Sequence, residues 1–443
     1  MSVSPYWNPK AETMSRVDLR RLQAAKLKAV AVRARAQSPF WRKRFDAAGF
    51  DPSMVTSIDD LRRLPPMTRT EWMQAQQENP PFGDLLAVPK GSAIRYHHTS
   101  GTTGRTPLRV LDGMRDWAWI SECWAIGFWG FGIRPHDTVF FAFSYGSFIG
   151  FWGAHYACEK MGSLVLPSGN MTTEQRVRQI VDMEATVVCA TPTYAIRMAQ
   201  TAKDMGIDLP SQAKVRRLII SGEPGGNIPA TKRLIEGLWG GKAADTAGMT
   251  ELGTIMMFEC EQQPGGCHII EDHFIEEVLD PETLEPVPYG ERGERVVTSF
   301  GRGAVPIFRY RTSDLVMKVP HTRCSCGRSY DIYEGGFLGR VDDMLLIRGT
   351  NVYPRAIESI VRERPMIEEF RIVVERVNNV DEITVCVEVR DDPVLDWSAF
   401  SFDLAKDLST ANEGLRINVD RAPHGTLPRF ELKAKRTEDR RPR

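Results

Sequence analysis

The chain has no net charge, since its 57 Lys and Arg residues balance its 57 Asp and Glu residues. This balance gives no basis for binding a polyanion through overall charge, so we expect no nucleic-acid partner. One stretch, residues 138–158, runs long enough without a formally charged residue to be weighed as a membrane span. It is broken by Gly146, Gly150 and Gly153. The breaks favour a buried strand, a loop and a helix start, and we expect no membrane partner.

Cysteines are also few: eight among 443 residues, too scattered for the disulfide framework of a secreted protein. The first residues lack the apolar run of a secretory signal, so we expect a cytoplasmic protein. With 42% apolar residues the chain can bury a large core, and its length exceeds that of most single domains. One large domain and one small domain are therefore expected.

Hydrophobic periodicity predicts an α/β fold. Two helices are expected over residues 15–45, interrupted at Ser38-Pro39. Strands and helices alternate between residues 138 and 247, which predicts a parallel sheet covered by helices. Short strands with turn signals between residues 268 and 318 predict a β-rich subdomain.

Past Asp342 the pattern changes to a self-contained α+β unit, with a helix over residues 353–364 and strands over 370–376 and 382–389. We therefore place a domain boundary there, with an N-terminal domain of residues 1–341 and a C-terminal domain of residues 342–443. The last dozen residues are strongly basic, and most of them are expected to be mobile.

A loop rich in hydroxyl groups and glycine is the first candidate for binding phosphate. It comprises Ser100, Gly101, Thr102, Thr103 and Gly104. The two glycines allow close backbone approach, and the hydroxyls can donate hydrogen bonds to phosphate oxygens. A polar hairpin turn is the alternative, and no Lys follows at the position that a Walker loop requires.

Two further segments follow predicted strands of the sheet. The first contains Glu223 and Pro224, and the second contains Asp245, Thr246, Ala247, Gly248, Thr250 and Glu251. Open α/β sheets bind ligands at the carboxyl ends of their strands. A Thr and a carboxylate placed there can hold a phosphate and Mg²⁺, although such a segment taken singly is more often a strand-to-helix turn.

The last two segments lie close to the predicted domain boundary. Asp314 can accept hydrogen bonds from both hydroxyls of a ribose, although an exposed loop carboxylate is the simpler explanation for it alone. The segment from Gly339 to Pro354 contains Arg340, Asp342, Gly349 and Tyr353. Its position at the change of composition predicts a hinge.

Taken in this order and spacing, the five segments resemble the adenylate-forming superfamily of acyl-CoA synthetases and, within it, the phenylacetate-CoA ligase family. The resemblance covers nearly the whole chain. It implies that ATP and Mg²⁺ activate a carboxylic acid as an acyl-adenylate, and that the acyl group then passes to coenzyme A. It also implies a mobile C-terminal domain and a homodimer.

The resemblance implies a role for each segment. The loop Ser100–Gly104 would close over the pyrophosphate end of ATP, Glu223 and Pro224 would lie beside adenine, and Thr250 and Glu251 would contact the α-phosphate and Mg²⁺. Asp314 and Arg340 would hold the ribose, Asp342 would be the hinge, and Gly349 and Tyr353 would line the coenzyme A tunnel. Lys433 would be the adenylation lysine, with Lys435 as its competitor.

Two positions depart from the family pattern. Ala247 stands where the family usually has a Tyr that stacks on adenine, and Leu432 replaces a common Gly beside the lysine. The chemistry itself requires a cation, because a carboxylate and a phosphate repel each other. A lysine ammonium and Mg²⁺ would offset that repulsion.

Four or five soft metal ligands cluster in the β-rich region: Cys260, Cys267, His268, Cys324 and Cys326. Four ligands suffice for a tetrahedral zinc. We favour Cys260, His268, Cys324 and Cys326 as a closed structural site. Reduced thiols without a metal are the alternative, because the spacing of Cys324 and Cys326 is less diagnostic than that of a zinc knuckle.

The resemblance places the acid pocket after the strand that begins at Thr138, and its candidates are Tyr145, Ser147, Phe148, Phe151, Trp152 and His155. Phe151 and Trp152 are larger than their counterparts in aryl-acid members, which favours a short, branched or hydroxy acid resembling 2-hydroxyisobutyrate. Both rings could instead belong to the core. Three alternatives remain: an aryl acid, transfer of AMP to a different acceptor, and a catalytically silent zinc-bearing binding protein.

Overall fold

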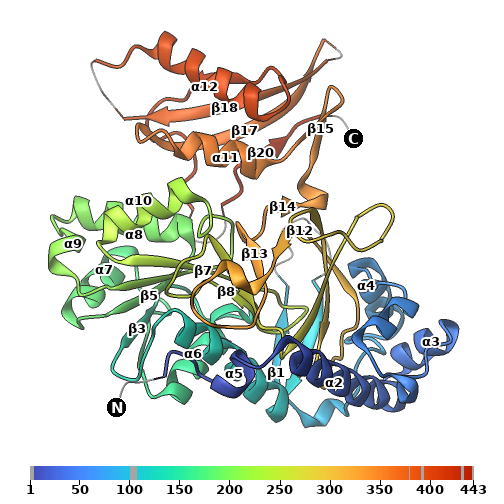
Figure 1. Ribbon diagram of the computed structural model, residues 1–443. Coiled ribbons are helices and arrows are strands. Elements are labelled where there is room, and N and C mark those ends of the chain that lie inside the picture. The colour runs from blue at the N-terminus through green and yellow to red at the C-terminus, as the bar shows by residue number, and fades with distance from the viewer. Residues whose placement is uncertain (1–3, 100–106, 379, 391–393, 431–433, 442–443) are drawn as a thin grey trace.

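The computed structural model describes residues 4–99, 107–378, 380–390, 394–430 and 434–441. Figure 1 shows a large lobe, formed by the N-terminal three quarters of the chain, and a smaller C-terminal lobe above it. The helices of the large lobe are α1 (Pro9–Glu12), α2 (Arg16–Gln37), α3 (Pro39–Ala47), α4 (Arg69–Glu78), α5 (Met114–Gly130), α6 (Gly150–Met161), α7 (Thr173–Asp182), α8 (Pro192–Asp204), α9 (Leu209–Gln212) and α10 (Pro229–Trp239). An antiparallel hairpin of β1 (Ala93–His98) and β2 (Arg109–Gly113) lies beside them.

The described residues of the large lobe form a twelve-stranded mixed sheet. Its parallel part consists of β3 (Thr138–Phe141), β4 (Leu164–Pro167), β5 (Val187–Ala190), β6 (Arg217–Ile220) and β7 (Lys242–Gly248). The antiparallel part consists of β8 (Ile255–Phe258), β9 (Gly266–Ile269), β10 (Phe274–Leu279), β11 (Arg292–Ser299), β12 (Tyr310–Val319), β13 (Ile332–Glu334) and β14 (Gly339–Arg340). Because β8 pairs with β7, the predicted β-rich region continues the parallel sheet.

Local sequence explains where several elements begin and end. Ser38 closes α2 and caps α3, since its hydroxyl accepts a hydrogen bond from the Trp41 amide and Pro39 begins the next helix. Strand β5 belongs to the predicted alternation of strands and helices between residues 138 and 247, and all four of its residues are buried. A stretch long enough to be weighed as a membrane span becomes β3, a loop and α6. Among the described residues, no helix combines the length and the apolar character needed to cross a bilayer.

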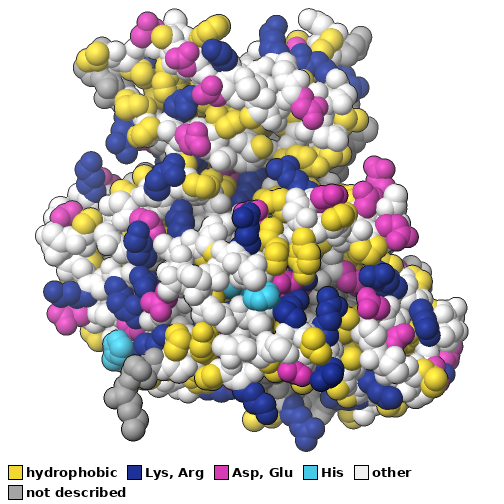
Figure 2. All heavy atoms as spheres, viewed as in Figure 1, with side chains coloured by type: hydrophobic (Ala, Val, Ile, Leu, Met, Phe, Trp, Pro, Cys, Tyr) yellow, Lys and Arg dark blue, Asp and Glu magenta, His cyan; other side chains and the backbone are white. Residues whose placement is uncertain are grey.

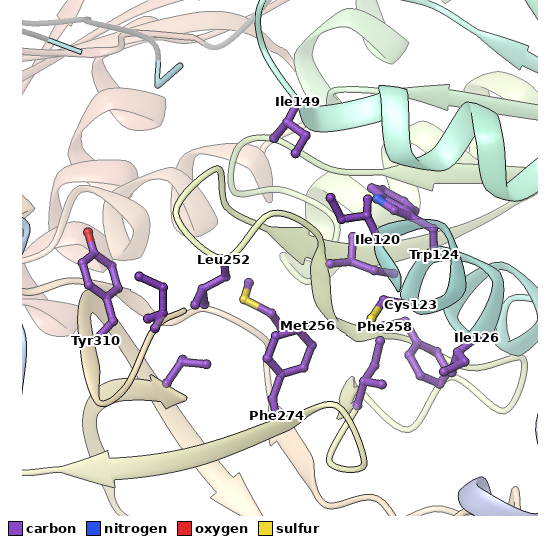
Figure 3. Close-up of a cluster of buried hydrophobic side chains, with 14 of the residues drawn as sticks. Ile120, Cys123, Trp124, Ile126, Ile149, Leu252, Met256, Phe258, Phe274 and Tyr310 are labelled. Carbon is purple, nitrogen blue, oxygen red and sulfur yellow. The ribbon is translucent and has the colours of Figure 1, made fainter. Parts of the chain in front are cut away.

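Helix α5 contributes most of its surface to the core. Figure 3 shows Ile120, Trp124 and Ile126 of this helix among the buried side chains of the large lobe, together with Met256 and Phe258 of β8. The predicted break at residues 146–153 lets Ile149 reach the same cluster. This cluster therefore joins α5, β8 and the loop before α6, and a second buried cluster packs between the parallel strands and helices α7, α8 and α10.

The C-terminal lobe has its own apolar core, drawn from residues between Leu345 and Val419. Its four-stranded sheet has the order β19 (Asn418–Arg421), β18 (Val380–Val389), β17 (Ile367–Val377) and β20 (Thr437–Asp439). The helices α11 (Pro354–Arg362) and α12 (Trp397–Ala411) and the hairpin of β15 (Leu345–Ile347) and β16 (Thr350–Val352) complete it. The expectation of a mobile tail is wrong for β20, which pairs in parallel with β17.

Candidate functional site

Four of the five predicted ligand-binding segments contribute residues to a cleft of about 810 Å³ that both lobes line. Figure 2 shows the waist between the larger and the smaller lobe. The predicted residues that line the cleft are Phe148, Phe151, Glu223, Pro224, Asp245, Thr246, Ala247, Gly248, Thr250, Glu251, Asp314, Arg340, Asp342 and Tyr353. The loop Ser100–Gly104 and Lys433 lie outside the described residues.

Thr250 and Glu251 follow β7 at the carboxyl end of the parallel sheet, and both are buried. Their backbone is fixed from below by Arg302, whose Nη1 donates to the carbonyl oxygens of Thr250 and Glu251 at 2.7 and 3.0 Å. Arg302 is itself held by a buried ion pair with Asp112, with an Nε to Oδ1 distance of 2.8 Å. The turn that carries the two predicted residues is thus rigidly supported.

Arg69, at the start of α4, is a cleft residue that sequence reasoning missed. Its Nη1 donates to Glu251 Oε1 at 2.5 Å and its Nη2 donates to Thr99 Oγ1 at 3.0 Å. Thr99 directly precedes the predicted phosphate loop. Arg69 therefore places a positive charge between two predicted phosphate-binding segments, at a site 182 residues away from Glu251 in sequence.

Asp314, in β12, is paired across the sheet with Arg340 of β14. Arg340 Nη1 donates to Asp314 Oδ1 at 3.1 Å, while its Nε and Nη2 bind the two carboxylate oxygens of Asp342 at 2.8 and 3.0 Å. Burial raises the pKa of Asp314 to about 6, although Arg340 and Arg295 oppose that rise. One guanidinium thus joins the predicted ribose ligand to the predicted hinge.

Asp245, at the end of β7, is buried and accepts a hydrogen bond from Asn227 Nδ2 at 2.5 Å. Burial and the nearby Glu259 carboxylate raise its pKa to about 7. The neighbouring Thr246 hydroxyl donates to the Met257 carbonyl at 2.8 Å, which ties β7 to β8. Asp245 and Thr246 therefore line the cleft and also stabilise the end of β7 through their hydrogen bonds.

The acid-pocket candidates divide into two groups. Phe148 and Phe151 line the cleft, and Phe151 stacks on Phe143 with ring centroids 3.9 Å apart. Tyr145, Ser147, Trp152 and His155 are not among the residues that line it. The Tyr145 hydroxyl and His155 Nδ1 instead lie 3.0 Å apart and hydrogen-bond each other. Trp124 of α5, which the sequence did not single out, lines the cleft beside Phe151.

The C-terminal tail enters the cleft. Ala434, Arg436 and Thr437 line it, and the Ala434 amide donates to Glu223 Oε2 at 2.6 Å. Lys435, the competing lysine, is exposed and is not among the lining residues. Within the same lobe, Tyr353 lines the cleft, whereas Gly349 lies in the turn between β15 and β16 with a φ of +84°.

The four favoured zinc ligands lie together, with all their ligand atoms within 4.8 Å of one another. Cys260 Sγ lies 3.5 Å from Cys324 Sγ, and Cys326 Sγ lies 3.3 Å from His268 Nε2. A tetrahedral zinc separates its sulfur ligands by about 3.8 Å, so the cluster is close to that geometry. His268 Nδ1 lies 2.9 Å from the Tyr330 carbonyl, which fixes the ring as a metal-bound histidine requires. Cys267 lies elsewhere, against Asn227.

Comparisons with known proteins agree with this architecture. The profile of the AMP-binding enzyme family matches residues 21–301, and that of the AMP-binding enzyme C-terminal domain matches residues 349–441. The chain is 34% identical to the phenylacetate-coenzyme A ligase of Thermus thermophilus, over 96% of this chain and 97% of the relative.

A solved 2-hydroxyisobutyryl-CoA ligase resembles the chain in two different states. In the postadenylation state with 2-HIB-AMP it is 31% identical with a TM-score of 0.93, covering 99% of this chain and 93% of that one. In the thioesterification state with 2-HIB-AMP and CoA the TM-score falls to 0.74, at 32% identity and coverages of 99% and 93%. The chain belongs to the AMP-binding enzyme family and, within it, to the adenylate-forming enzymes related to phenylacetate-CoA ligase.

Proposed function

We propose that the chain activates a small branched or hydroxylated carboxylic acid, of the 2-hydroxyisobutyrate type. The chain is an AMP-forming acyl-CoA ligase, which joins the acid to AMP from ATP and then transfers the acyl group to coenzyme A. The observation that carries the substrate proposal is the aromatic wall of the cleft, where the Phe151 ring packs against the rings of Phe143 and Trp124. Large rings at that position shorten the space left for the acid.

The cleft residues support a division of labour in adenylate formation. Thr250 and Glu251 would hold the α-phosphate, with Asp314 and Arg340 on the ribose. Mg²⁺ would neutralise charge on the phosphate oxygens. Glu251 fits a magnesium ligand, because its contacts with Arg69 and Tyr310 both use Oε1 and leave Oε2 available among the described residues. Arg69, which contacts Glu251 directly, would then place a positive charge beside the same phosphates.

The proposal also includes a movement of the C-terminal lobe relative to the large lobe between the two half-reactions. The TM-score is lower against the thioesterification state of the 2-hydroxyisobutyryl-CoA ligase at nearly the same sequence identity, which supports a different placement of the lobes in that state. A rotation at Asp342, between domains of residues 1–341 and 342–443, would withdraw the tail and bring Gly349 towards the cleft. Homodimer formation stays a prediction from the family resemblance.

Acid-dependent AMP release, measured with and without coenzyme A over short branched, hydroxy and aromatic acids, tests the substrate proposal. We expect the highest kcat/KM with a small branched or hydroxy acid, and AMP release that depends on coenzyme A. Phe151→Ala should shift the preference by about tenfold towards phenylacetate, since it removes a ring that fills the pocket. The phenylacetate-coenzyme A ligase relative favours an aryl acid instead, and a wild-type preference for phenylacetate would decide for that alternative.

The raised pKa of Asp314 predicts how ATP binding depends on pH. As pH falls through about 6, Asp314 gains a proton and loses both its charge and an acceptor for a ribose hydroxyl. We expect the KM for ATP to rise below pH 6 and to be constant above pH 7.5. Asp314→Asn should raise the KM about tenfold at pH 8 and abolish this pH dependence.

Protonation of Asp314 would not raise the KM for ATP by unfolding the protein. The folded pKa of about 6 lies above the ordinary value of 3.8, so protonation of Asp314 makes the fold more stable as pH falls. Calorimetric titration of ATP at pH 5.5 and 8 checks the prediction independently of turnover. Parallel pH profiles for wild type and Asp314→Asn would contradict the role of Asp314.

A further inference from the structure

The tail that carries Lys433 is anchored to its own lobe on both sides of the lysine. Before it, Glu388 accepts hydrogen bonds from the Gly425 and Leu427 amides and from Arg429 Nη2. After it, the Arg436 carbonyl accepts a hydrogen bond from the Ile372 amide at 2.7 Å. Arg436 also binds Glu369, with an Nε to Oε1 distance of 2.8 Å. The tail must therefore travel with the small lobe when that lobe moves.

One carboxylate of the large lobe reaches this tail. Glu223 Oε2 accepts the hydrogen bond from the Ala434 amide at 2.6 Å, one residue after Lys433. Beside it, Arg436 Nη2 donates to Thr193 Oγ1 at 3.3 Å. These contacts join residues more than two hundred positions apart, with separations of 211 and 243. They exist only while the two lobes are docked in this pose.

Glu223 is held in place independently of the tail. Its other oxygen, Oε1, accepts a hydrogen bond from the Thr193 amide at 3.0 Å. Thr193 lies in the first turn of α8, where unpaired amides and the helix dipole favour a negative charge. Both carboxylate oxygens thus face backbone amides. This arrangement differs from the adenine contact that the family resemblance implies for Glu223.

We infer that Glu223 is a positioning residue that docks the C-terminal tail at the cleft, through the Ala434 amide, for adenylate formation. The inference rests on the proposed function, because it assigns Glu223 to one of the two half-reactions. A charge-assisted hydrogen bond of this length favours the docked pose over others. Arg355 adds a further cross-lobe contact away from the tail, to the Gly335 carbonyl at 2.9 Å. At the tail itself, Glu223 is the charged partner and the Arg436–Thr193 contact is the neutral-acceptor one.

Two half-reactions separate the role of Glu223 from adenine binding. Acid-dependent exchange of pyrophosphate into ATP measures adenylate formation, and coenzyme A added to a supplied acyl-adenylate measures thioester formation. For Glu223→Ala we expect kcat for exchange to fall about 10- to 100-fold, with a KM for ATP within about twofold of wild type. Thioester formation should stay within about twofold. Glu223→Gln keeps one acceptor oxygen and should lose less than Glu223→Ala.

A matched control is Gln200→Ala, an exposed residue of α8 near the tail, which should leave both half-reactions unchanged. Spin labels at Met183→Cys and Phe402→Cys, both exposed and on opposite lobes, measure docking without turnover. Glu223→Ala should reduce the docked population relative to wild type in a Cys386→Ser background.

Three results would overturn the inference: a raised KM for ATP at unchanged kcat, equal losses in both half-reactions, or an unaltered distance distribution between the labels. Failure of the proposed function is a separate observation. It would appear as a wild-type protein that releases no AMP with any acid, while the labels still report how Glu223 affects docking.

Discussion

Lys433→Ala is expected to remove most acyl-adenylate formation while leaving transfer from a supplied acyl-adenylate to coenzyme A intact. A positive charge between the carboxylate and the α-phosphate acts only while two anions are brought together, and its loss should cost about 10²- to 10³-fold in that step. The second step needs no such charge there, because the acid is already neutralised as a mixed anhydride. Pyrophosphate exchange and thioester formation, measured separately, check this expectation.

Lys435→Ala is the matched control, since Lys435 is exposed and is not among the lining residues of the cleft. It removes the same charge two residues further along the tail and should leave exchange within about twofold of wild type. The absence of Lys435 from the residues that line the cleft favours Lys433 as the acting lysine. A larger loss of exchange in Lys435→Ala than in Lys433→Ala would reverse the assignment.

Removal of zinc is expected to have the largest effect on stability. We propose that Cys260, His268, Cys324 and Cys326 bind one structural zinc, because their donor atoms converge within 4.8 Å and three of the four residues are buried. A closed site of this kind contributes folding free energy directly. Cys324→Ser should lose the metal and lower Tm by on the order of 10 °C.

Elemental analysis of the purified chain should find one zinc per molecule, and a strong chelator should lower Tm in wild type but not in Cys324→Ser. Cys386→Ser is the control, since Cys386 lies in β18 of the small lobe, outside the cluster. The Sγ separation of 3.5 Å between Cys260 and Cys324 is too long for a disulfide. A metal-free wild type with the same Tm as Cys324→Ser would refute the zinc proposal.

The order of the motifs and the local signals for helices and strands could be predicted from the sequence. The Ser38-Pro39 break was predictable because proline lacks an amide hydrogen and a serine hydroxyl caps the following helix. The strand at Val187–Ala190 was predictable because its apolar run is short and precedes a helical pattern. Such features depend on neighbours a few residues away.

From the sequence, His268 is favoured over Cys267 as a metal ligand, but local pattern alone gives no physical reason for that preference. Cys267 and His268 are adjacent in β9, and neighbouring side chains of a strand point to opposite faces. His268 accordingly meets Cys326 on one face, while Cys267 meets Asn227 on the other. Both residues are candidates in the sequence, and the face of β9 that each side chain occupies decides which one lies beside the other ligands.

The amino-acid sequence by itself determined the family, the two-lobed organisation and the set of segments that carry polar groups, because these follow from local pattern and from motif order. Only the tertiary structure decided which groups meet. Arg69 reaches Glu251, Tyr145 turns to His155, and Glu223 receives the amide of Ala434. The physical reason is that a contact across many residues depends on how sheets and lobes pack, which no local periodicity encodes.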